Sequence, residues 1–597
     1  MKLPSLSDIT DKAQNAFKRF PITILWSVFG SLFFIYQFEQ NNSNPFDSNY
    51  NLSLTLLLGV SWLIGVQFFI EQFKNPKKWQ FLKLIMLGLL FLFYLYIPSF
   101  ENYNQNIEYI FRFFLYLIGG HLFTLFSPFI TKWDKNAYWN YLRLTAIAII
   151  RSLFFSFILY LGLSLALVAI DALFEITIRG KRYGQLFVFC LGVVNTWIYL
   201  SDFPKNIFKN TEIEFEKALE VLVKYILIPL VLLYIIILYA YTLKILIQWE
   251  LPKGWVSYLV IALSILGYVI QVMINPFQKN IKSWTINKFQ PWFYLLLIPL
   301  NILLFVAIFR RVNDYGITEN RYFILAFAFW NIGIILYILF SKTKALKVIP
   351  ISLFCIAILS SFGLWGAFSV SNNSQARQFE NLFFKIKEDN NTATYDELDR
   401  LKSILKYLEK KKSVSILDKT TNLTLENYRE EPINEKSEHG SLDNYKIWET
   451  LAIKLDSTSI NKSNNNTKYY YLNNSSNLKH VEDISNFDEF IYLEYFNSER
   501  EITSNDLIVN LNMTEKEISI RLKNDTTVKI EIPLLDKLKE LSKFSTNLNE
   551  ASKEDLTIEV TSEELSAKMI FSNLSFNTEV NIIELTHIQA FLFIKKQ

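Results

Sequence analysis

The chain has 597 residues, of which 51% are hydrophobic and only 19% are charged, a composition too apolar for an ordinary soluble protein of this length. Its formal net charge of +4 gives no support for a nucleic-acid partner, because nucleic-acid-binding proteins present a strongly basic surface. The two cysteines, Cys190 and Cys355, lie inside apolar runs, which argues against a disulfide framework and against a thiolate metal site.

Residues 1–20 form a basic lead in which Leu6, Ala13 and Phe17 recur near helical spacing. Pro21 ends this pattern, because proline cannot continue the hydrogen bonding of a helix from its interior. We therefore expect a cytoplasmic amphipathic helix on the membrane surface, and no removable signal peptide.

From residue 21 to residue 370 the chain alternates between apolar runs and short polar loops. A transmembrane helix needs roughly 20 mostly apolar residues, and by this criterion the sequence predicts about eleven spans. The expected fold is an α-helical polytopic membrane bundle followed by a small periplasmic α+β domain. The apolar runs lie at residues 22–38, 53–72, 81–98, 108–128, 145–173, 185–201, 222–247, 255–275, 291–309, 322–340 and 348–369.

The loops between these runs differ in charge. With the N-terminus inside, the inner segments carry far more Lys and Arg than the outer loops, and the first two outer loops, "EQNNSNPFDSNY" and "SFENYNQN", carry none. Short positively charged loops stay on the cytoplasmic side of a membrane. An odd number of spans then places the tail outside. We expect a bacterial inner (cytoplasmic) membrane protein with a cytoplasmic N-terminus and a periplasmic C-terminal domain.

Two outer loops carry positive charge against this preference, "IRGKRYG" at residues 178–184 and "RRVNDYGITENRY" at residues 310–322. Such charges are tolerated where acids or bound anions compensate them. The second loop is either a salt-bridged connection between two helices or a site where arginine forks hold a phosphate or carboxylate group. The candidate ligand-binding residues, for an anion or a lipid headgroup, are Arg310, Arg311, Asp314, Glu319 and Arg321.

Four stretches carry a resemblance to a known family: "NTWIYLS", "LYAYTLKILIQWELPKGWVSYLV", "RRVNDYGITENRYFILAFAFW" and "SFGLWGAFSVSNNSQ". In this order they resemble the multi-pass membrane proteins grouped as domain of unknown function four-one-five-three, which are frequent in the Bacteroidota. The resemblance covers roughly residues 20 to 375 of the sequence. It implies an inner-membrane protein, in some cases with an extra-membrane C-terminal region, and no catalytic residues to carry over.

Polar residues inside the predicted spans are costly in lipid and tend to face a bundle interior or an aqueous cavity. The candidates are Arg112, Arg151, Asn301 and Asn331. Arg151 lies about 18 Å along its helix if that helix starts near Trp139. It is an inner anchor instead if residues 136–150 lie along the membrane surface.

Beyond residue 370 the composition becomes polar. Residues 371–470 are expected to form a helical connector with helices at 375–388 and 395–411. Leu398, Leu401, Leu405 and Leu408 form an apolar stripe on the second of these helices, which is typical of a packing face.

Residues 471–597 are expected to form the periplasmic α+β domain, because apolar and polar residues alternate in "FIYLEYF", "DLIVNLN", "EISIRL", "TVKIEI", "DLTIEV" and "AKMIF". "LKNDTT" predicts a hairpin turn that joins Ile518 and Ile520 to Ile530 and Ile532. Pro533 then opens a helix in "PLLDKLKELSKF".

Signs of catalysis are few. The four histidines are scattered without metal-ligand spacing, no glycine-rich phosphate loop precedes a helix, and the sequence predicts no catalytic residue, metal or cofactor. Three functions stay open: a non-enzymatic envelope scaffold or sensor that binds a protein partner through residues 371–597, a transporter or lipid-handling protein with a polar cavity lined by the four intramembrane residues, and a membrane transferase acting on a lipid-linked substrate.

Overall fold

The computed structural model describes residues 6–40, 49–98, 107–209, 211–213, 216–248, 255–278, 283–429, 442–455, 468–473, 484–495, 500–504, 506–512, 517–523, 527–543, 548, 551–579 and 582–597. The chain divides into two compact units. The helical unit comprises Met1–Ala393 and Glu397–Lys454, and the β unit comprises Thr394–Asp396 and Leu455–Gln597.

The helical unit begins with α1 (Leu6–Arg19), which ends where Pro21 starts α2 (Pro21–Glu39). Proline suits this first position because its missing N–H would have no partner inside the helix. The elements that follow are α3 (Tyr50–Glu71), η1 (Pro76–Trp79), α4 (Phe81–Tyr96), α6 (Glu108–Phe126), η2 (Ser127–Phe129), α7 (Lys135–Phe174), α8 (Lys181–Val188), η3 (Phe189–Val194), α9 (Asn195–Asp202), α10 (Lys217–Val221), η4 (Leu222–Leu227), α11 (Ile228–Gln248), α12 (Trp255–Ile274), α13 (Trp284–Tyr315), α14 (Glu319–Phe340) and α15 (Val348–Leu359).

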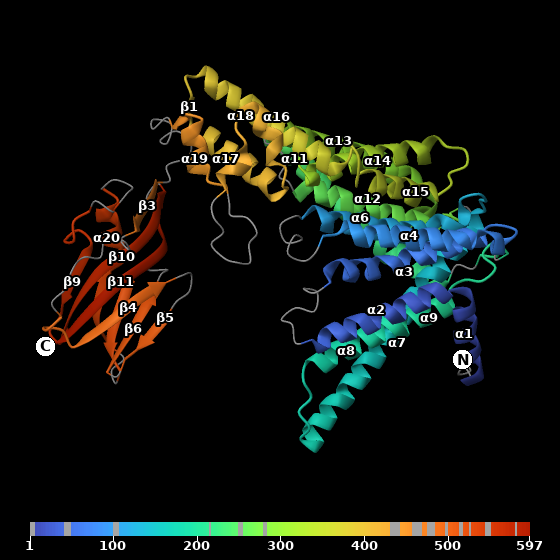
Figure 1. Cartoon of the computed structure of the whole chain (residues 1–597), viewed down its shortest axis with the longest axis horizontal. Coiled ribbons are helices and arrows are strands. Elements are labelled where there is room, and N and C mark those ends of the chain that lie inside the picture. The colour runs from blue at the N-terminus through green and yellow to red at the C-terminus, as the bar shows by residue number, and fades with distance from the viewer. Residues whose placement is uncertain are drawn as a thin grey trace. The chain divides into compact units, whose positions relative to one another are not determined.

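Ten helical segments among the described residues are long and apolar enough to cross a membrane. They correspond to the first ten predicted runs, so the predicted helical membrane bundle is confirmed. Two of them contain a π-helical stretch, η3 and η4, and in each case the neighbouring helices continue the same rod (Figure 1).

The eleventh predicted run, 348–369, does not form one spanning helix. Its helix α15 has 12 residues, about 18 Å of helical rise, which is too short to span alone. The segment from Ala345 to Trp365 nevertheless runs along the full length of α14. At one end the Ala345 N–H donates to the Tyr337 hydroxyl, and at the other end the Tyr322 hydroxyl donates to the Trp365 carbonyl. Irregular backbone is tolerated at such depth where protein surrounds it, and Ser361 is fully buried.

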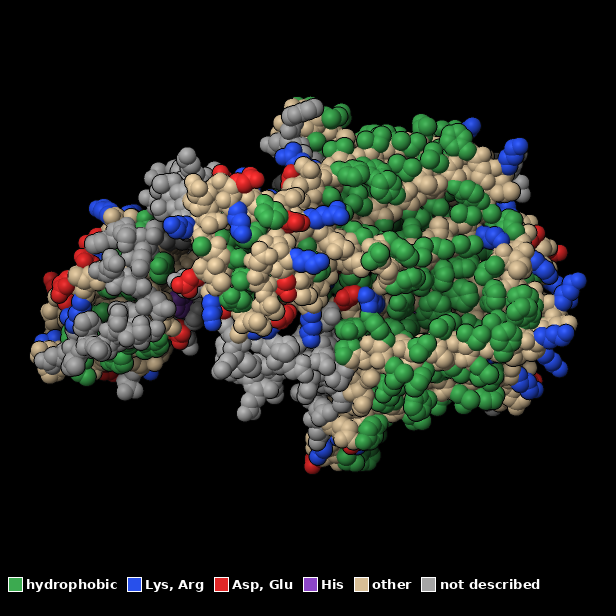
Figure 2. All heavy atoms as spheres, turned by 45° about the horizontal axis from the view of Figure 1, so that its top comes forward, with side chains coloured by type: hydrophobic (Ala, Val, Ile, Leu, Met, Phe, Trp, Pro, Cys, Tyr) green, Lys and Arg blue, Asp and Glu red, His purple; other side chains and the backbone are tan. Residues whose placement is uncertain are grey.

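Apolar side chains cover the outside of the helical unit as well as its interior. Figure 2 shows a broad hydrophobic surface, with Lys and Arg gathered along one rim. α7 is the extreme case, since large apolar residues such as Phe154, Leu165 and Phe174 are exposed along it. A helix that is apolar all round is stable only where lipid or protein surrounds it. The helical unit is therefore a membrane bundle whose lipid-facing surface is visible.

The helical unit ends in a connector that carries its own core. Its elements are α16 (Ala367–Glu388), β1 (Thr392–Ala393), α17 (Tyr395–Lys410), η5 (Val414–Leu417), α18 (Asp418–Thr421), η6 (Leu425–Tyr428), α19 (Asn444–Thr450) and β2 (Lys454–Leu455). Leu401, Leu405 and Leu408 are buried against Phe379 and Phe383 of α16, so the predicted stripe on α17 is a packing face. α16 starts eight residues earlier than residue 375, where the sequence predicted its start.

The β unit has two antiparallel sheets around one apolar core. One sheet has the order β3-β10-β11-β4, with β9 also pairing β10, and the other has the order β5-β6-β7-β8. The elements are β3 (Lys468–Asn473), β4 (Glu489–Tyr495), β5 (Arg500–Thr503), β6 (Leu507–Asn512), β7 (Glu517–Leu522), β8 (Val528–Pro533), α20 (Leu534–Leu541), β9 (Thr557–Thr561), β10 (Leu565–Glu579) and β11 (Ile582–Lys596).

The predicted pairing of β7 with β8 is confirmed, because Ile518 lies opposite Ile532 and Ile520 lies opposite Ile530. The middle of the turn itself, residues 524–526, lies outside the described residues. The helix expected after Pro533 is α20, whose Leu534, Leu538 and Leu541 are buried in the core between the sheets.

Candidate functional site

The arginine-rich sequence "RRVNDYGITENRY" forms the last turn of α13, a tight reversal and the first turn of α14. Gly316 ends α13 with a φ of +72°, a conformation that residues with a side chain rarely adopt. A Cβ at this position would lie 2.8 Å from Cγ of Gln378 on α16, so the connector packs directly over the reversal.

The structure places the five predicted ligand-binding residues in this one turn but gives them different surroundings. Arg310 pairs with Asp314 at 3.0 Å on the surface. Arg311 is exposed and has no hydrogen bond or ion pair among the described residues. Arg321 donates to the carbonyls of Tyr315 and Gly316 at 3.1 and 2.7 Å. Anion binding by these arginines stays a prediction.

The fifth residue, Glu319, forms a buried ion pair with Lys411 and accepts a hydrogen bond from Tyr407. We call these three residues the connector junction. The Lys411 ammonium lies 2.9 Å from one carboxylate oxygen of Glu319, and the Tyr407 hydroxyl donates to the other at 2.9 Å. The side chains of Lys411 and Glu319 are only 7% and 8% exposed. Burial, and to a lesser degree the charge of Glu319, raises the pKa of Tyr407.

Aromatic rings complete the surroundings of Lys411. Its ammonium lies 5.6 Å from the ring centroid of Phe111 on α6 and 5.8 Å from that of Phe368 on α16. Cation–π attraction of this kind is strongest where water is excluded. The junction therefore joins α14, α6 and the connector through one desolvated cation.

Further contacts fasten the connector to the backbone of the α13–α14 reversal. The Gln375 side-chain amide donates to the carbonyls of Tyr315 and Ile317 at 2.9 and 3.0 Å. The hydroxyl of Ser374 accepts from the Ile317 N–H at 2.8 Å, and Arg400 donates to the Asp314 carbonyl. The final carbonyls of a helix have no partner within it, so the connector acts as the C-terminal cap of α13.

Sequence reasoning found Glu319 but missed its partners. Lys411 stands in the run "EKKKS", which resembles an ordinary solvated charged segment, and Tyr407 lies on the side of α17 beside the leucine stripe. Glu319 and Lys411 are 92 positions apart, and no local spacing rule links residues at such separation.

Arg112 is held close to the connector junction. It pairs with Glu108 one helical turn earlier, and its guanidinium lies 5.3 Å from the ring of Tyr96 and 5.2 Å from the ring of Phe368. A cavity of about 470 Å³, mostly lined by apolar residues of α3, α4 and α6 and by α15, reaches Arg112.

Asn301 and Asn331 form a closed network in the centre of the bundle. The Asn331 amide donates to Oδ1 of Asn301 at 2.9 Å and to the Ser264 hydroxyl at 3.1 Å. The Tyr268 hydroxyl donates to the Asn331 carbonyl oxygen, and the Asn301 amide donates to the carbonyl of Ala328 at 3.2 Å. Both asparagines are fully buried, so this network joins α12, α13 and α14 as interhelical glue.

Arg151 lies apart from the other three intramembrane candidates. α7 is one uninterrupted helix of 40 residues, and the Arg151 guanidinium pairs with Asp202 at the end of α9 at 3.0 Å. Lys12 of α1 pairs with the same carboxylate at 3.5 Å. Residues 136–150 belong to the same unbroken helix as Arg151, which is the condition set for the first interpretation, and the role of Arg151 as an inner anchor stays a prediction.

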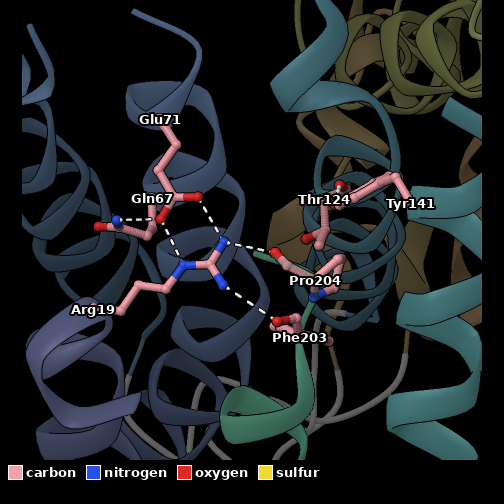
Figure 3. Close-up of polar contacts among 7 residues, drawn as sticks. All are labelled: Arg19, Gln67, Glu71, Thr124, Tyr141, Phe203 and Pro204. Carbon is pink, nitrogen blue, oxygen red and sulfur yellow. Dashed lines mark hydrogen bonds and ion pairs between the residues drawn. The ribbon is translucent and has the colours of Figure 1, made fainter. Parts of the chain in front are cut away.

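A second polar cluster, which the sequence did not indicate, lies near the junction of α1 and α2 (Figure 3). Arg19 binds both carboxylate oxygens of Glu71, at 2.8 and 2.6 Å, and donates to the Pro204 carbonyl at 3.0 Å. Gln67 donates to the same carboxylate at 2.7 Å. All three guanidinium nitrogens of Arg19 donate hydrogen bonds, so this cluster fastens α1 to α3 and to the segment after α9.

No group of three or more His, Cys, Asp or Glu residues in the described part of the chain could hold a metal ion. Within each polar cluster described above, the side chains bind one another. The fold is that of a polytopic helical membrane protein that carries a small antiparallel β unit. The chain belongs to the family described as Domain of unknown function (DUF4153), whose model matches residues 15–391.

One relative is an uncharacterized protein, PM1469, of Pasteurella multocida (strain Pm70). It is 30% identical to this chain over 232 residues, and the matched segment covers 37% of this chain and 38% of that protein. No solved structure matches the chain.

Proposed function

We propose that the protein is a scaffold or sensor of the bacterial inner membrane, whose helical bundle holds a periplasmic interaction domain. The connector junction is the observation that carries this proposal. A buried ion pair and a set of backbone caps fix α16 and α17 on the α13–α14 reversal, so that the connector cannot move freely against the bundle.

The proposed orientation follows from charge. The α3–α4 connection carries Lys74, Lys77 and Lys78, and the α14–α15 connection carries a further group of lysines. The Lys347 ammonium donates to the Phe129 carbonyl at 2.6 Å, and the nearby Thr131 bonds the Gln72 side chain, so both connections lie at one end of the bundle. Positive residues favour the cytoplasmic side. The connector at the opposite end is then periplasmic.

The β unit offers a surface for the partner. Phe490 and Tyr492 on β4 are 55% and 46% exposed, and their rings lie 6.0 and 5.7 Å from that of Phe591 on β11. β4 is the last strand of its sheet in the described order. An exposed edge strand with aromatic side chains is suited to adding a strand from another protein.

The test is photo-crosslinking in the native membrane from a probe amino acid at position 490 or 492 of the full-length chain. We expect one defined envelope protein to be captured there, and not from the same probe at the exposed Lys539 on α20. The scaffold proposal would be contradicted if the probe at position 539 captured the same protein as the probe at position 490 or 492. It would also be contradicted if neither position 490 nor position 492 captured a protein.

The runner-up is a transporter or lipid-handling protein. The cavity that reaches Arg112 favours lipid handling, whereas the closed asparagine network gives no support to a polar conduction path. Uptake of a solute by proteoliposomes, lost in an Asn331→Leu variant that still folds, would favour this alternative.

A further inference from the structure

The first of the two basic outer loops noted in the sequence, "IRGKRYG", borders a cavity of about 620 Å³. The cavity is lined by residues near the end of α2, by one residue of α7, by the segment between α7 and α8, and by the start of the α8–η3 rod. α8 packs against both α2 and α7. Its apolar wall includes Ile35, Leu167, Leu186 and Phe189, and its polar lip includes Arg179 and Arg182.

The cavity lies at the level where several membrane-spanning helices end. α2, α7 and the α8–α9 rod are all long and apolar enough to cross a bilayer. Glu39, the last residue of α2, contacts the residues that start α8, so the lip lies where spanning helices end. Phe189 in the wall is itself exposed, so the cavity is open at the surface of the helical unit.

The lip carries more positive charge than its acidic neighbour balances. Glu39 accepts hydrogen bonds from Lys181 at 2.9 Å and from Arg182 at 3.0 Å, so one carboxylate serves two cations. The Arg179 side chain is exposed and has no ion pair or hydrogen bond among the described residues. Asp171 and Glu175 lie near the end of α7 but do not line the cavity.

We propose that this cavity binds an anionic phospholipid. The phosphate group lies against Arg179 and Arg182, whose planar guanidinium groups suit phosphate oxygens, and an acyl chain lies along Ile35, Leu167 and Leu186. A soluble anion would leave the apolar wall unused. A zwitterionic phospholipid carries its own headgroup cation, which already balances its phosphate, so it would compensate the charge of Arg179 less well than an anionic phospholipid. The bound phosphate also explains why positive residues stand on a side of the membrane that normally lacks them.

This proposal goes beyond the proposed function, because it concerns a lipid site that shares no residue with the connector junction. Native mass spectrometry of the full-length protein in mild detergent tests it, with short-chain phosphatidylglycerol, short-chain phosphatidylcholine and glycerol phosphate as the probes. We expect one phosphatidylglycerol to bind in preference to phosphatidylcholine, and glycerol phosphate not to compete.

The variant Arg179→Gln/Arg182→Gln is expected to weaken phosphatidylglycerol binding about tenfold or more, because each cation near an anionic lipid surface contributes a factor of about five. The matched control, Lys77→Gln/Lys78→Gln, removes the same charge from exposed positions on η1 and should bind as the wild type does. Equal binding by the two double variants would overturn the proposal. So would equal binding of the two lipids by the wild-type protein, or competition by glycerol phosphate.

A second variant separates the apolar wall from the charge. Leu186→Trp places a larger ring in the cavity wall, against the proposed position of the acyl chain, and leaves both arginines in place. Loss of phosphatidylglycerol from this variant, with unchanged thermal unfolding, is expected if the acyl chain occupies the cavity. Retention of the lipid with wild-type affinity would show that the arginines attract phospholipid at the surface alone, and would overturn the assignment of the cavity.

Discussion

The carboxylate of Glu319 depends on a single cation among the described residues, the ammonium of Lys411. Both groups have lost their water, and the free energy of this desolvation is offset only while they remain together. By contrast, Arg310 and Asp314 form an exposed pair one helical turn apart, where water solvates each charge whether or not the pair forms.

The variant Lys411→Met is therefore expected to destabilise the helical unit by about 3–5 kcal/mol, because it leaves a buried carboxylate without a partner. Arg310→Met, the matched control, should cost less than about 1 kcal/mol. Thermal unfolding in detergent, followed by tryptophan fluorescence, measures both. The double variant Lys411→Met/Glu319→Gln should recover much of the loss. Similar effects of Lys411→Met and Arg310→Met would show that the junction is hydrated.

Glu319 illustrates what a sequence shows about a single residue. Its position at the start of a predicted span was evident, and so was its place in a charged turn. Its burial depends on α16 and α17 covering the turn, and on an ion pair with a residue 92 positions away. Such a pairing follows from tertiary packing, for which a local pattern carries no signal.

At the scale of helices, the asparagine network joins three spans. Replacement of Asn331 by Leu removes donors to Asn301 and Ser264 and an acceptor for Tyr268, and we expect a cost of about 1–2 kcal/mol. The double variant Asn301→Leu/Asn331→Leu should cost less than the sum of the single changes, because both remove the same central hydrogen bond. Additive losses in unfolding measurements would contradict a shared network.

Helix packing offers a sharper test at Gly267 on α12. A Cβ there would lie 1.9 Å from Cζ of Phe293 on α13, a ring that is fully buried. Gly267→Ala should therefore destabilise the bundle by about 1–3 kcal/mol, since the ring has no room to retreat. Gly333→Ala on α14 is the control, because a Cβ there meets nothing within 4 Å and alanine favours a helix. A stable Gly267→Ala variant would mean that α12 and α13 pack less closely.

The elements that sequence reasoning predicted well are those governed by local physics. Apolar runs long enough to cross a bilayer became spanning helices, because backbone groups in lipid must bond within their own segment. α15 departs from this rule where protein surrounds the chain near Ser361. The strand β11 was missed because its centre, "AFLFI", is apolar at successive positions, with Leu592, Phe593 and Ile594 all buried, and so lacks the alternation typical of a strand with one exposed face.

At the scale of the whole molecule, the two units have separate cores. The buried clusters of the helical unit contain no residue beyond Ile453, and that of the β unit begins at Tyr470. We expect deletion of residues 456–597 to leave the unfolding temperature of the helical unit nearly unchanged. All 13 tryptophans precede residue 455, so tryptophan fluorescence reports on the helical unit alone. A fall of many degrees would show that the β unit stabilises the bundle.

The orientation of the chain is a further property of the whole molecule. We predict that the ten long helices cross the membrane once each and that α15 with the residues after it completes one more crossing among the described residues. This odd number of passages predicts that the two ends of the helical unit lie on opposite sides. Positive charge near Lys77 then favours a cytoplasmic α3–α4 connection.

In a background without Cys190 and Cys355, an impermeant maleimide applied to spheroplasts should label Glu563→Cys on the β unit. It should label Lys77→Cys only after permeabilisation. Labelling of both positions from the same side would contradict the odd number of passages, and the reverse pattern would invert the proposed orientation.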